Sequence, residues 1–250
     1  IQADFIDLDN NCEFVFEKSY VDSIDDEFIQ LLFTIFSKSR DFGVCNHTCL
    51  KEKSYPKKPF ITSTLQQSAQ NELGFSVGMT MDIAQKLYES GHITYMRTDS
   101  TFISEEFQTQ LNRKVNMDYG KGYYQKSKEK KVKGAQEAHE AIRPTHLFQY
   151  PPLDGIQKKL YDFILKRTIT SHMKPALYDV YKIQLTNDTT KEYGFFTTKY
   201  RQLQFPGYLS YGGKQFDIQK EPDFKDVYTL DNCKSSEKQD TEPNYYNESD

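Results

Sequence analysis

The chain has 250 residues, a formal net charge of −4 and 37% hydrophobic residues. It is long enough to bury a substantial core, either as one large domain or as two of ordinary size. No apolar run is long enough to span a bilayer, and the start lacks the basic-then-apolar layout of a signal peptide. We therefore expect an intracellular protein with no membrane contact. Because the chain starts at Ile1 and Asp250 ends no recognisable element, we expect a piece of a larger protein.

The charge is unevenly distributed along the chain. Residues 59–174 hold 16 Lys and Arg against 12 Asp and Glu, whereas the flanking residues hold 16 against 24. The basic excess therefore belongs to the central segment. That excess is modest, so we expect strong phosphate binding to be supplied by parts of the parent protein outside this chain.

The first 58 residues predict a β-rich region with one helix. Alternating polar and apolar residues from Ala3 to Phe16, interrupted by an Asp-Asn-Asn turn, predict a β-hairpin. A helix follows, and Phe42 to Leu50 predicts a strand. The basic, proline-containing segment Lys51 to Lys58 is interpreted as a linker and the first domain boundary. The apolar face of the predicted helix contains Phe28, Leu31, Leu32, Ile35 and Phe36.

The predicted strand contains Cys45 and Cys49 on either side of His47. Only three potential ligands lie together there, whereas zinc takes four. We therefore favour a half-buried strand over a metal site and expect no metal ligand in the chain. The chain is also too large to need disulfide bonds for its stability.

The central segment, 59–174, predicts mostly helix. Hydroxyl caps at 62–64 begin a helix that ends at Leu73 before Gly74, and a second runs from Met79 to Ser90. This pair has the outline of a helix-turn-helix. A helix from Ser104 to Val115, a mobile loop over 117–134 that includes the lysine-rich run 126–133, and a long helix capped by Asp154 complete the segment.

Pro175 ends the last helix and forms the second boundary. Beyond it, strands are predicted over 178–185, 194–199, 205–211, 215–218 and 227–230, followed by a polar, acidic tail. The predicted fold is α+β, with a mostly helical helix-turn-helix-like domain inserted in a β-rich arch domain. The boundaries give three segments: the first half of the arch (1–58), the helical domain (59–174) and the second half of the arch with the tail (175–250).

Tyr95 lies just beyond a predicted helix end, in the sequence Ile-Thr-Tyr-Met-Arg-Thr-Asp-Ser that starts at Ile93. In an extended segment Tyr95, Arg97 and Asp99 would project to one side, and Ile93 before them to the same side. Met96 and Thr98 would project to the other side. A phenol with a guanidinium on the same side suggests phosphate chemistry, because Arg holds phosphate oxygens with two donors. On the spacing alone, an ordinary strand with a surface salt bridge is the favoured interpretation.

Three runs together resemble type IA DNA topoisomerases. The run that contains Tyr95 resembles the active-site tyrosine motif, and 59–67 and 138–145 match further motifs in the same order. Met96 and the run Ala-His-Glu-Ala-Ile-Arg-Pro-Thr (138–145) resemble the bacterial topoisomerase I and reverse gyrase branches. The resemblance is dense from Pro59 to Pro175 and thin outside it.

The resemblance implies an enzyme in which Tyr95 attacks a phosphodiester of single-stranded DNA and becomes joined to its 5′ phosphate. Arg97 would stabilise the charge on phosphorus, and His139 would order the active site or hydrogen-bond the scissile phosphate region. Arg143 is a DNA-binding candidate together with Arg97 and His139, although bracing of the motif is the favoured role for Arg143. Asp99 is expected to hold Arg97 in place.

The resemblance also implies parts that this sequence lacks. Type IA enzymes need a Toprim domain with a catalytic glutamate, an Asp-X-Asp magnesium site and a lysine that protonates the leaving oxygen. We therefore expect the Mg²⁺ ligands to lie outside this chain, the remaining domains of the parent to be its partners, and the chain alone to be inactive. The alternative is a non-catalytic module on the same scaffold that binds single-stranded DNA or a partner. Either protein would be DNA-associated within the cell.

Overall fold

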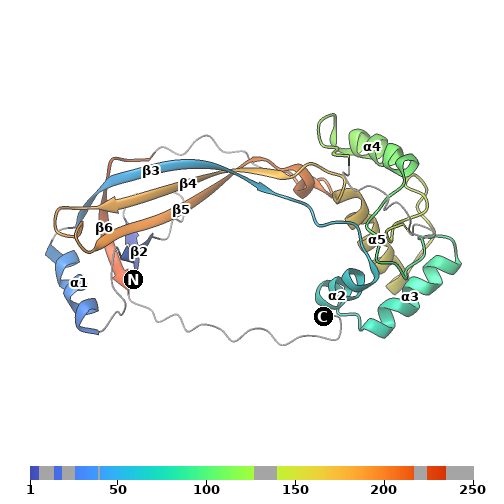
Figure 1. Cartoon of the computed structure of the whole chain (residues 1–250), viewed down its shortest axis with the longest axis horizontal. Coiled ribbons are helices and arrows are strands. Elements are labelled where there is room, and N and C mark those ends of the chain that lie inside the picture. The colour runs from blue at the N-terminus through green and yellow to red at the C-terminus, as the bar shows by residue number, and fades with distance from the viewer. Residues whose placement is uncertain (6–13, 19–25, 39, 127–139, 217–223, 235–250) are drawn as a thin grey trace. The chain divides into compact units, whose positions relative to one another are not determined.

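The computed structural model describes residues 1–5, 14–18, 26–38, 40–126, 140–216 and 224–234. These residues form an α+β fold of two compact units (Figure 1). Unit 1 consists of the described residues within Ile1–Lys53, Leu177–Phe205 and Asp217–Glu242, and unit 2 of those within Ser54–Ala176 and Pro206–Phe216. The chain therefore leaves unit 1 after its first part, forms most of unit 2 and then returns.

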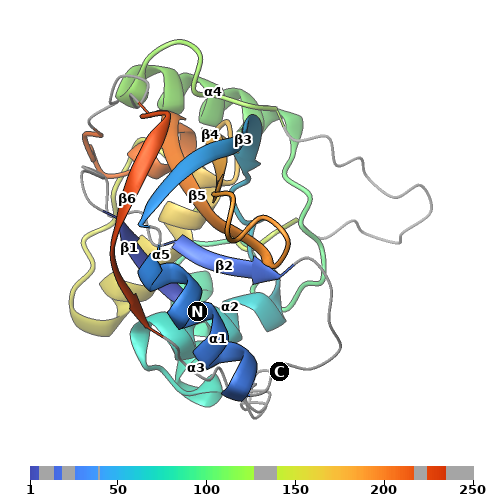
Figure 2. The same cartoon turned by 90° about the vertical axis from the view of Figure 1, so that its left-hand side faces the viewer.

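Unit 1 is built around a closed antiparallel barrel (Figure 2). The strand order around the barrel is β1-β2-β5-β4-β3-β6, so no strand among them is left as an edge. Ala3 pairs with Phe14, which confirms the predicted N-terminal hairpin. The strands are β1 (Gln2–Phe5), β2 (Phe14–Lys18), β3 (Asp41–Ser54), β4 (Ala176–Thr186), β5 (Gly194–Phe205) and β6 (Val227–Lys234).

Phenylalanine rings fill the core of unit 1. The ring of Phe196 on β5 lies 5.2 Å from that of Phe42 on β3, in an edge-to-face arrangement, and 5.0 Å from that of Phe36. Phe36 and the buried Leu32 come from the predicted helix, α1 (Asp26–Lys38). Leu31, which was expected on the same face, is 45% exposed, because only the side of α1 that carries Leu32 and Phe36 faces the barrel.

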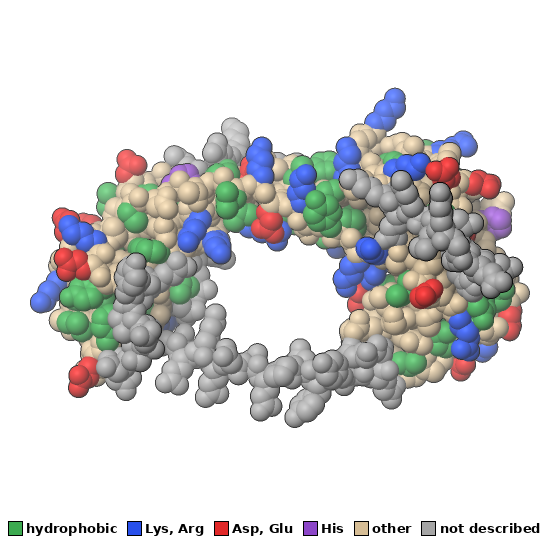
Figure 3. Space-filling view, in the orientation of Figure 1, with side chains coloured by type: hydrophobic (Ala, Val, Ile, Leu, Met, Phe, Trp, Pro, Cys, Tyr) green, Lys and Arg blue, Asp and Glu red, His purple; other side chains and the backbone are tan. Residues whose placement is uncertain are grey.

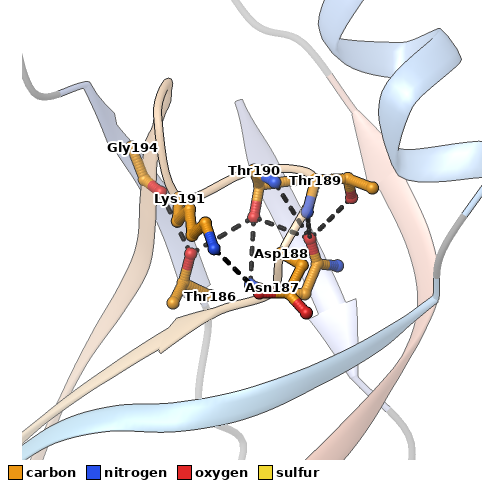
Figure 4. A network of polar contacts seen from close by, with 7 residues as sticks. All are labelled: Thr186, Asn187, Asp188, Thr189, Thr190, Lys191 and Gly194. Atoms are coloured by element: carbon orange, nitrogen blue, oxygen red, sulfur yellow. Dashed lines mark hydrogen bonds and ion pairs between the residues drawn. The ribbon is translucent and has the colours of Figure 1, made fainter.

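The turn between β4 and β5 is fixed by the side chain of Asn187 (Figure 4). Its Oδ1 accepts hydrogen bonds from the backbone N–H groups of Thr189 at 3.1 Å and Thr190 at 3.0 Å. The Thr190 hydroxyl accepts the backbone N–H of Asn187 at 3.2 Å, and Lys191 pairs with Asp188 at 2.9 Å. Asparagine side chains commonly replace backbone partners in turns in this way. The turn sets the antiparallel register of β4 and β5.

Three predictions for the β-rich parts differ in detail from the structure. β3 continues through Ser54, so the first half of the expected linker over 51–58 is strand, and unit 2 begins at Ser54 rather than at Pro59. The expected strand over 205–211 is instead a short 3₁₀ helix, η1 (Gly207–Ser210), which belongs to unit 2. Residues 215–216 form no strand, and 217–218 lie outside the described residues.

Unit 2 contains four α-helices. They are α2 (Thr62–Leu73), α3 (Val77–Glu89), α4 (Glu105–Tyr119) and α5 (Gly155–Thr170), all close to their predicted positions. α2 ends as expected at Gly74, which has a φ of 70° and donates to the carbonyl of Gln70 at 3.2 Å. α4 continues to Tyr119, beyond its predicted end at Val115, so the expected loop starts later.

Two apolar clusters hold these helices together. One joins α2, α3 and α5 with the buried Phe60, Ile93 and Met96, and the other joins α4 to the end of α5. The helix-turn-helix outline of α2 and α3 is thus part of a packed core, and its use in DNA binding stays a prediction. No helix in the described part of the chain is both long and apolar enough to cross a membrane.

Candidate active site

The segment that carries Tyr95 begins immediately after α3. Gly91 adopts a φ of 72°, a left-handed conformation that suits glycine, and reverses the chain. The backbone N–H of His92 then bonds to the carbonyl of Leu87 at 2.8 Å. The hydroxyl of Thr145 donates to the carbonyl of Gly91 at 2.7 Å. The start of the segment is therefore held both by the helix and by a residue more than fifty positions away.

Side chains along this segment alternate between solvent and core. Tyr95 is 40% exposed, and Arg97 and Asp99 are also exposed, whereas Met96 is 1% exposed and Thr98 is buried. This alternation confirms the orientation predicted for those five residues, although the segment is not a regular strand.

Ile93 departs from this prediction. It is buried rather than placed on the side of Tyr95, because it forms an isolated antiparallel bridge with Pro144. The burial of Ile93 and Met96 in the α2–α3–α5 core fixes the backbone on both sides of Tyr95.

Thr62 joins the first of the three motifs to the segment of Tyr95. Its hydroxyl donates to the carbonyl of Met96 at 2.8 Å and accepts the backbone N–H of Thr98 at 2.8 Å. Its own N–H bonds to the carbonyl of Thr98 at 2.9 Å. One residue at the start of α2 thus fixes the backbone on both sides of Arg97.

Thr94 joins the third motif to the same segment. Its N–H bonds to the carbonyl of Arg143 at 2.9 Å, and its hydroxyl accepts the N–H of Arg143 at 3.0 Å and donates to the carbonyl of Ala141 at 2.7 Å. The N–H of Ile142 bonds to the carbonyl of Phe60 at 2.8 Å. The three motifs, far apart in sequence, are therefore hydrogen-bonded to one another around Tyr95.

The side chain of Arg143 is turned into the protein. It pairs with Glu140, donates from Nη1 to the carbonyl of Pro144 at 2.9 Å, and lies over the ring of Phe107 at 3.9 Å. Burial lowers the pKa of the Arg143 guanidinium, and the neighbouring Glu140 carboxylate opposes that shift. These contacts fit the bracing role rather than contact with DNA. His139, the other candidate of this motif, lies outside the described residues.

Arg97 lines an open cavity of about 530 Å³ at the N-terminus of α2. Ser63, Gln66 and Asp99 also line it. Within the described residues Arg97 forms no ion pair or hydrogen bond, so the expected brace from Asp99 is absent there. The first turn of α2 contains no acidic residue. The unpaired guanidinium and the positive end of the helix dipole both favour an anion in this cavity.

The ring of Tyr95 packs against a second tyrosine. Tyr88, in the last turn of α3, lies with its ring centroid 5.2 Å from that of Tyr95, at an interplanar angle of 63°. Edge-to-face pairs of this kind are favoured by the ring quadrupoles. The sequence alone does not distinguish Tyr88, because its only signal there is an aromatic residue near a helix end.

A family model described as DNA topoisomerase matches residues 3–250. The chain belongs to the type IA DNA topoisomerases. A relative from Acanthamoeba polyphaga mimivirus, DNA topoisomerase 1 type prokaryotic, is 45% identical over 168 residues, which cover 62% of this chain and 19% of the relative. DNA topoisomerase 1 of Campylobacter jejuni is 37% identical over 204 residues, which cover 75% of this chain and 29% of that protein.

The fold is also shared with a solved type IA enzyme. Full-length topoisomerase I from Thermotoga maritima matches with a TM-score of 0.69 and 30% identity, over 92% of this chain and 38% of that one. The chain thus spans less than a third of the length of the curated relatives named above, and under two fifths of the solved enzyme.

The type IA family implies a Mg²⁺ requirement, but the described residues offer no fitting site. No group of three or more His, Cys, Asp or Glu side chains that could hold a metal occurs among them. Cys45 instead donates from Sγ to the carbonyl of Gln184 at 3.3 Å, and the ring of His47 stacks on that of Tyr181 at 5.9 Å.

Proposed function

We propose that this chain is the catalytic-tyrosine and hinge portion of a type IA topoisomerase, with Tyr95 as the nucleophile on single-stranded DNA. The observation that carries the proposal is the backbone pairing of the three motifs, which holds Tyr95 and Arg97 toward solvent. A nucleophile in a rigid, preorganised setting loses little freedom when the substrate binds.

In the proposed reaction the Tyr95 oxygen attacks the phosphorus of a backbone phosphodiester. The phenol loses its proton, a bond from the tyrosine oxygen to phosphorus forms, and the bond from phosphorus to the 3′ oxygen breaks. The 3′ oxygen takes up a proton and leaves as a hydroxyl. The 5′ phosphate stays joined to Tyr95, so the reverse reaction reseals the strand without ATP after another strand has passed.

Arg97 is proposed to act on the phosphate rather than on the tyrosine alone. Attack adds negative charge to the phosphate oxygens, and a guanidinium can hold two of them. The N-terminus of α2 borders the same cavity and supplies further positive potential. Asp99, also on the lining, faces this cavity with the opposite charge and would disfavour an anion that comes too close to it.

The rest of the proposed machinery belongs to the parent protein. The proton for the leaving 3′ oxygen and the Mg²⁺ site are assigned to a Toprim domain outside this chain, and strand passage to the complete enzyme. Such an enzyme would be DNA-associated within the cell.

The test is cleavage by the intact parent enzyme with substitutions at Arg97. Arg97→Ala should lower the cleavage rate by about 10² to 10³, the usual result of losing one charge-stabilising donor. Arg97→Lys should recover only part of that, since an ammonium lacks the two-pronged geometry. Arg113→Ala, an exposed arginine on α4, is the matched control and should cleave like the wild type. Wild-type cleavage by Arg97→Ala would contradict the role, and DNA binding without any cleavage would favour a non-catalytic module.

A further inference from the structure

A second cavity in unit 2, of about 440 Å³, shares no lining residue with the cavity beside Arg97. It is bordered by the last turns of α5, by η1 and by the segment that precedes α2. Its volume lies within the range of about 300 to 1,000 Å³ that is typical of small-molecule sites. The tyrosine chemistry proposed above makes no use of it.

The lining is strongly basic. Lys57, Lys166 and Lys214 border the cavity with exposed side chains, and none of them forms an ion pair with a described residue. Glu72 is the one acidic side chain on the lining. Lys and Arg side chains gather on the surface near α5 in the space-filling view (Figure 3). Several cations with one counter-charge create a positive potential that attracts an anion.

A fourth cation, Arg167, is held in place. Its guanidinium lies over the ring of Phe60 at 4.0 Å, and Nη1 donates to the carbonyl of Lys58 at 3.4 Å. Burial lowers the pKa of Arg167 and nearby Glu72 opposes that shift, yet an arginine remains charged at neutral pH. The cavity therefore combines one oriented guanidinium with three exposed ammonium groups.

Aromatic side chains form the apolar part of the lining. Phe163, Tyr208 and Tyr211 border the cavity, and the Tyr208 hydroxyl is hydrogen-bonded to that of Ser54 at 3.1 Å. Burial raises the pKa of Tyr211 to about 12, so its phenol is neutral at physiological pH and does not repel an anion. Phe163 is buried, whereas the rings of Tyr208 and Tyr211 are partly exposed. Cations next to exposed aromatic rings are the combination that binds single-stranded nucleic acids, through phosphates and stacked bases.

We propose that this cavity is a second contact for the DNA strand, with phosphates on Lys166 and Lys214 and one base against the ring of Tyr211. The proposal rests on the proposed function to the extent that the ligand is single-stranded DNA. Lys57 borders this cavity and Ile61 borders the one beside Arg97, and four residues of chain span at most about 14 Å. A strand of a few nucleotides could therefore reach both.

The test is fluorescence anisotropy of a labelled oligothymidylate with the whole 250-residue chain at several salt concentrations. For a single strand, each phosphate contact that is removed makes the slope of log K against log salt shallower by about 0.7. The double variant Lys166→Ala, Lys214→Ala should therefore bind more weakly, with a slope shallower by about 1.4. Lys159→Ala removes an exposed lysine from the same helix but outside the cavity, and it should leave the slope unchanged.

The aromatic half of the proposal has its own pair of variants. Tyr211→Leu should weaken binding at least about five-fold through loss of stacking, whereas Tyr211→Phe keeps the ring and should bind like the wild type. Thermal unfolding of each variant shows whether the fold survives. Wild-type slope in the double lysine variant, wild-type affinity in Tyr211→Leu, or no binding by the wild-type chain would overturn the proposal. None of these results bears on adduct formation by the parent enzyme, which tests Tyr95 separately.

Discussion

Tyr88 contributes to the orientation of the Tyr95 ring, because the two rings pack edge to face while both stay 40% exposed. An aromatic pair contributes about 0.5 to 1.5 kcal/mol beyond its buried area. In the intact parent, Tyr88→Ala should therefore slow cleavage by about 2- to 10-fold without unfolding the protein. Tyr88→Phe keeps the ring contact and should cleave at the wild-type rate. A large loss in Tyr88→Phe would instead assign a role to the Tyr88 hydroxyl.

The partly buried pair of Arg143 and Glu140 is predicted to be structural. The two side chains are only 12% and 22% exposed, and Glu140 Oε1 also accepts the backbone N–H of Ser104 at 2.7 Å. Glu140→Gln leaves the guanidinium without its counter-charge, so the free energy of unfolding should fall by about 2 to 4 kcal/mol. Urea denaturation measures the change. Glu105→Gln changes a side chain that is 84% exposed, so it should alter the free energy of unfolding by less than about 0.5 kcal/mol. An equal loss in Glu140→Gln and Glu105→Gln would contradict a structural role for the pair.

At the scale of elements, the start of η1 depends on one glycine. Gly207 has a φ of +50°, and a Cβ added there would lie 2.4 Å from the carbonyl oxygen of Lys174. Gly207→Ala should therefore lower the free energy of unfolding by at least about 2 kcal/mol. Gly212 also has a positive φ, +79°, but open space around it. Gly212→Ala should therefore lower the free energy of unfolding only by the backbone strain of about 1 kcal/mol. Equal losses of unfolding free energy for the two variants, measured by denaturant unfolding, would contradict the close approach of Gly207 to the Lys174 carbonyl.

The same glycine explains why this element is not predictable from the sequence. The apolar residues over 205–211 have the composition of a strand, but the close contact between Gly207 and the end of the central segment is a tertiary feature without a local pattern. α2 and α3 were predictable because hydroxyl residues and Gly74 mark their ends. β3 was placed correctly but ended too early, since its exposed Lys and Glu residues look like a linker.

For the candidate site, the sequence predicts the direction of the side chains but not the contacts between distant residues. Alternation along the segment gives the outward direction of Tyr95 and Arg97, because it is a local property of extended chain. The hydrogen bonds of Thr62 with Met96 and Thr98 join residues 34 and 36 positions apart, and only the fold brings them together. The absence of a brace between Asp99 and Arg97 in the described residues likewise depends on side-chain directions that spacing does not give.

At the scale of the whole molecule, this chain is proposed to be one part of a larger catalyst. It spans 19% to 29% of the two curated relatives described above, and no described cluster could hold Mg²⁺. The chain alone should therefore neither relax supercoiled DNA nor form an adduct, as gel electrophoresis would show. Addition of the Toprim-bearing remainder should restore some cleavage. Magnesium-dependent relaxation by this chain alone would show that the missing parts are not needed.

The central claim is that Tyr95 forms the covalent link to DNA, and mapping of the adduct tests it most directly. The intact parent enzyme is trapped on labelled single-stranded DNA, digested with nuclease and protease, and the labelled peptide is identified by mass spectrometry. The account predicts a 5′-phosphoryl link on Tyr95 and on none of the other tyrosines among the 18 in this chain. Tyr95→Phe should stay folded, because the ring and its contact with Tyr88 remain, and it should yield no adduct. A link on a different residue, or cleavage by Tyr95→Phe, would contradict the account.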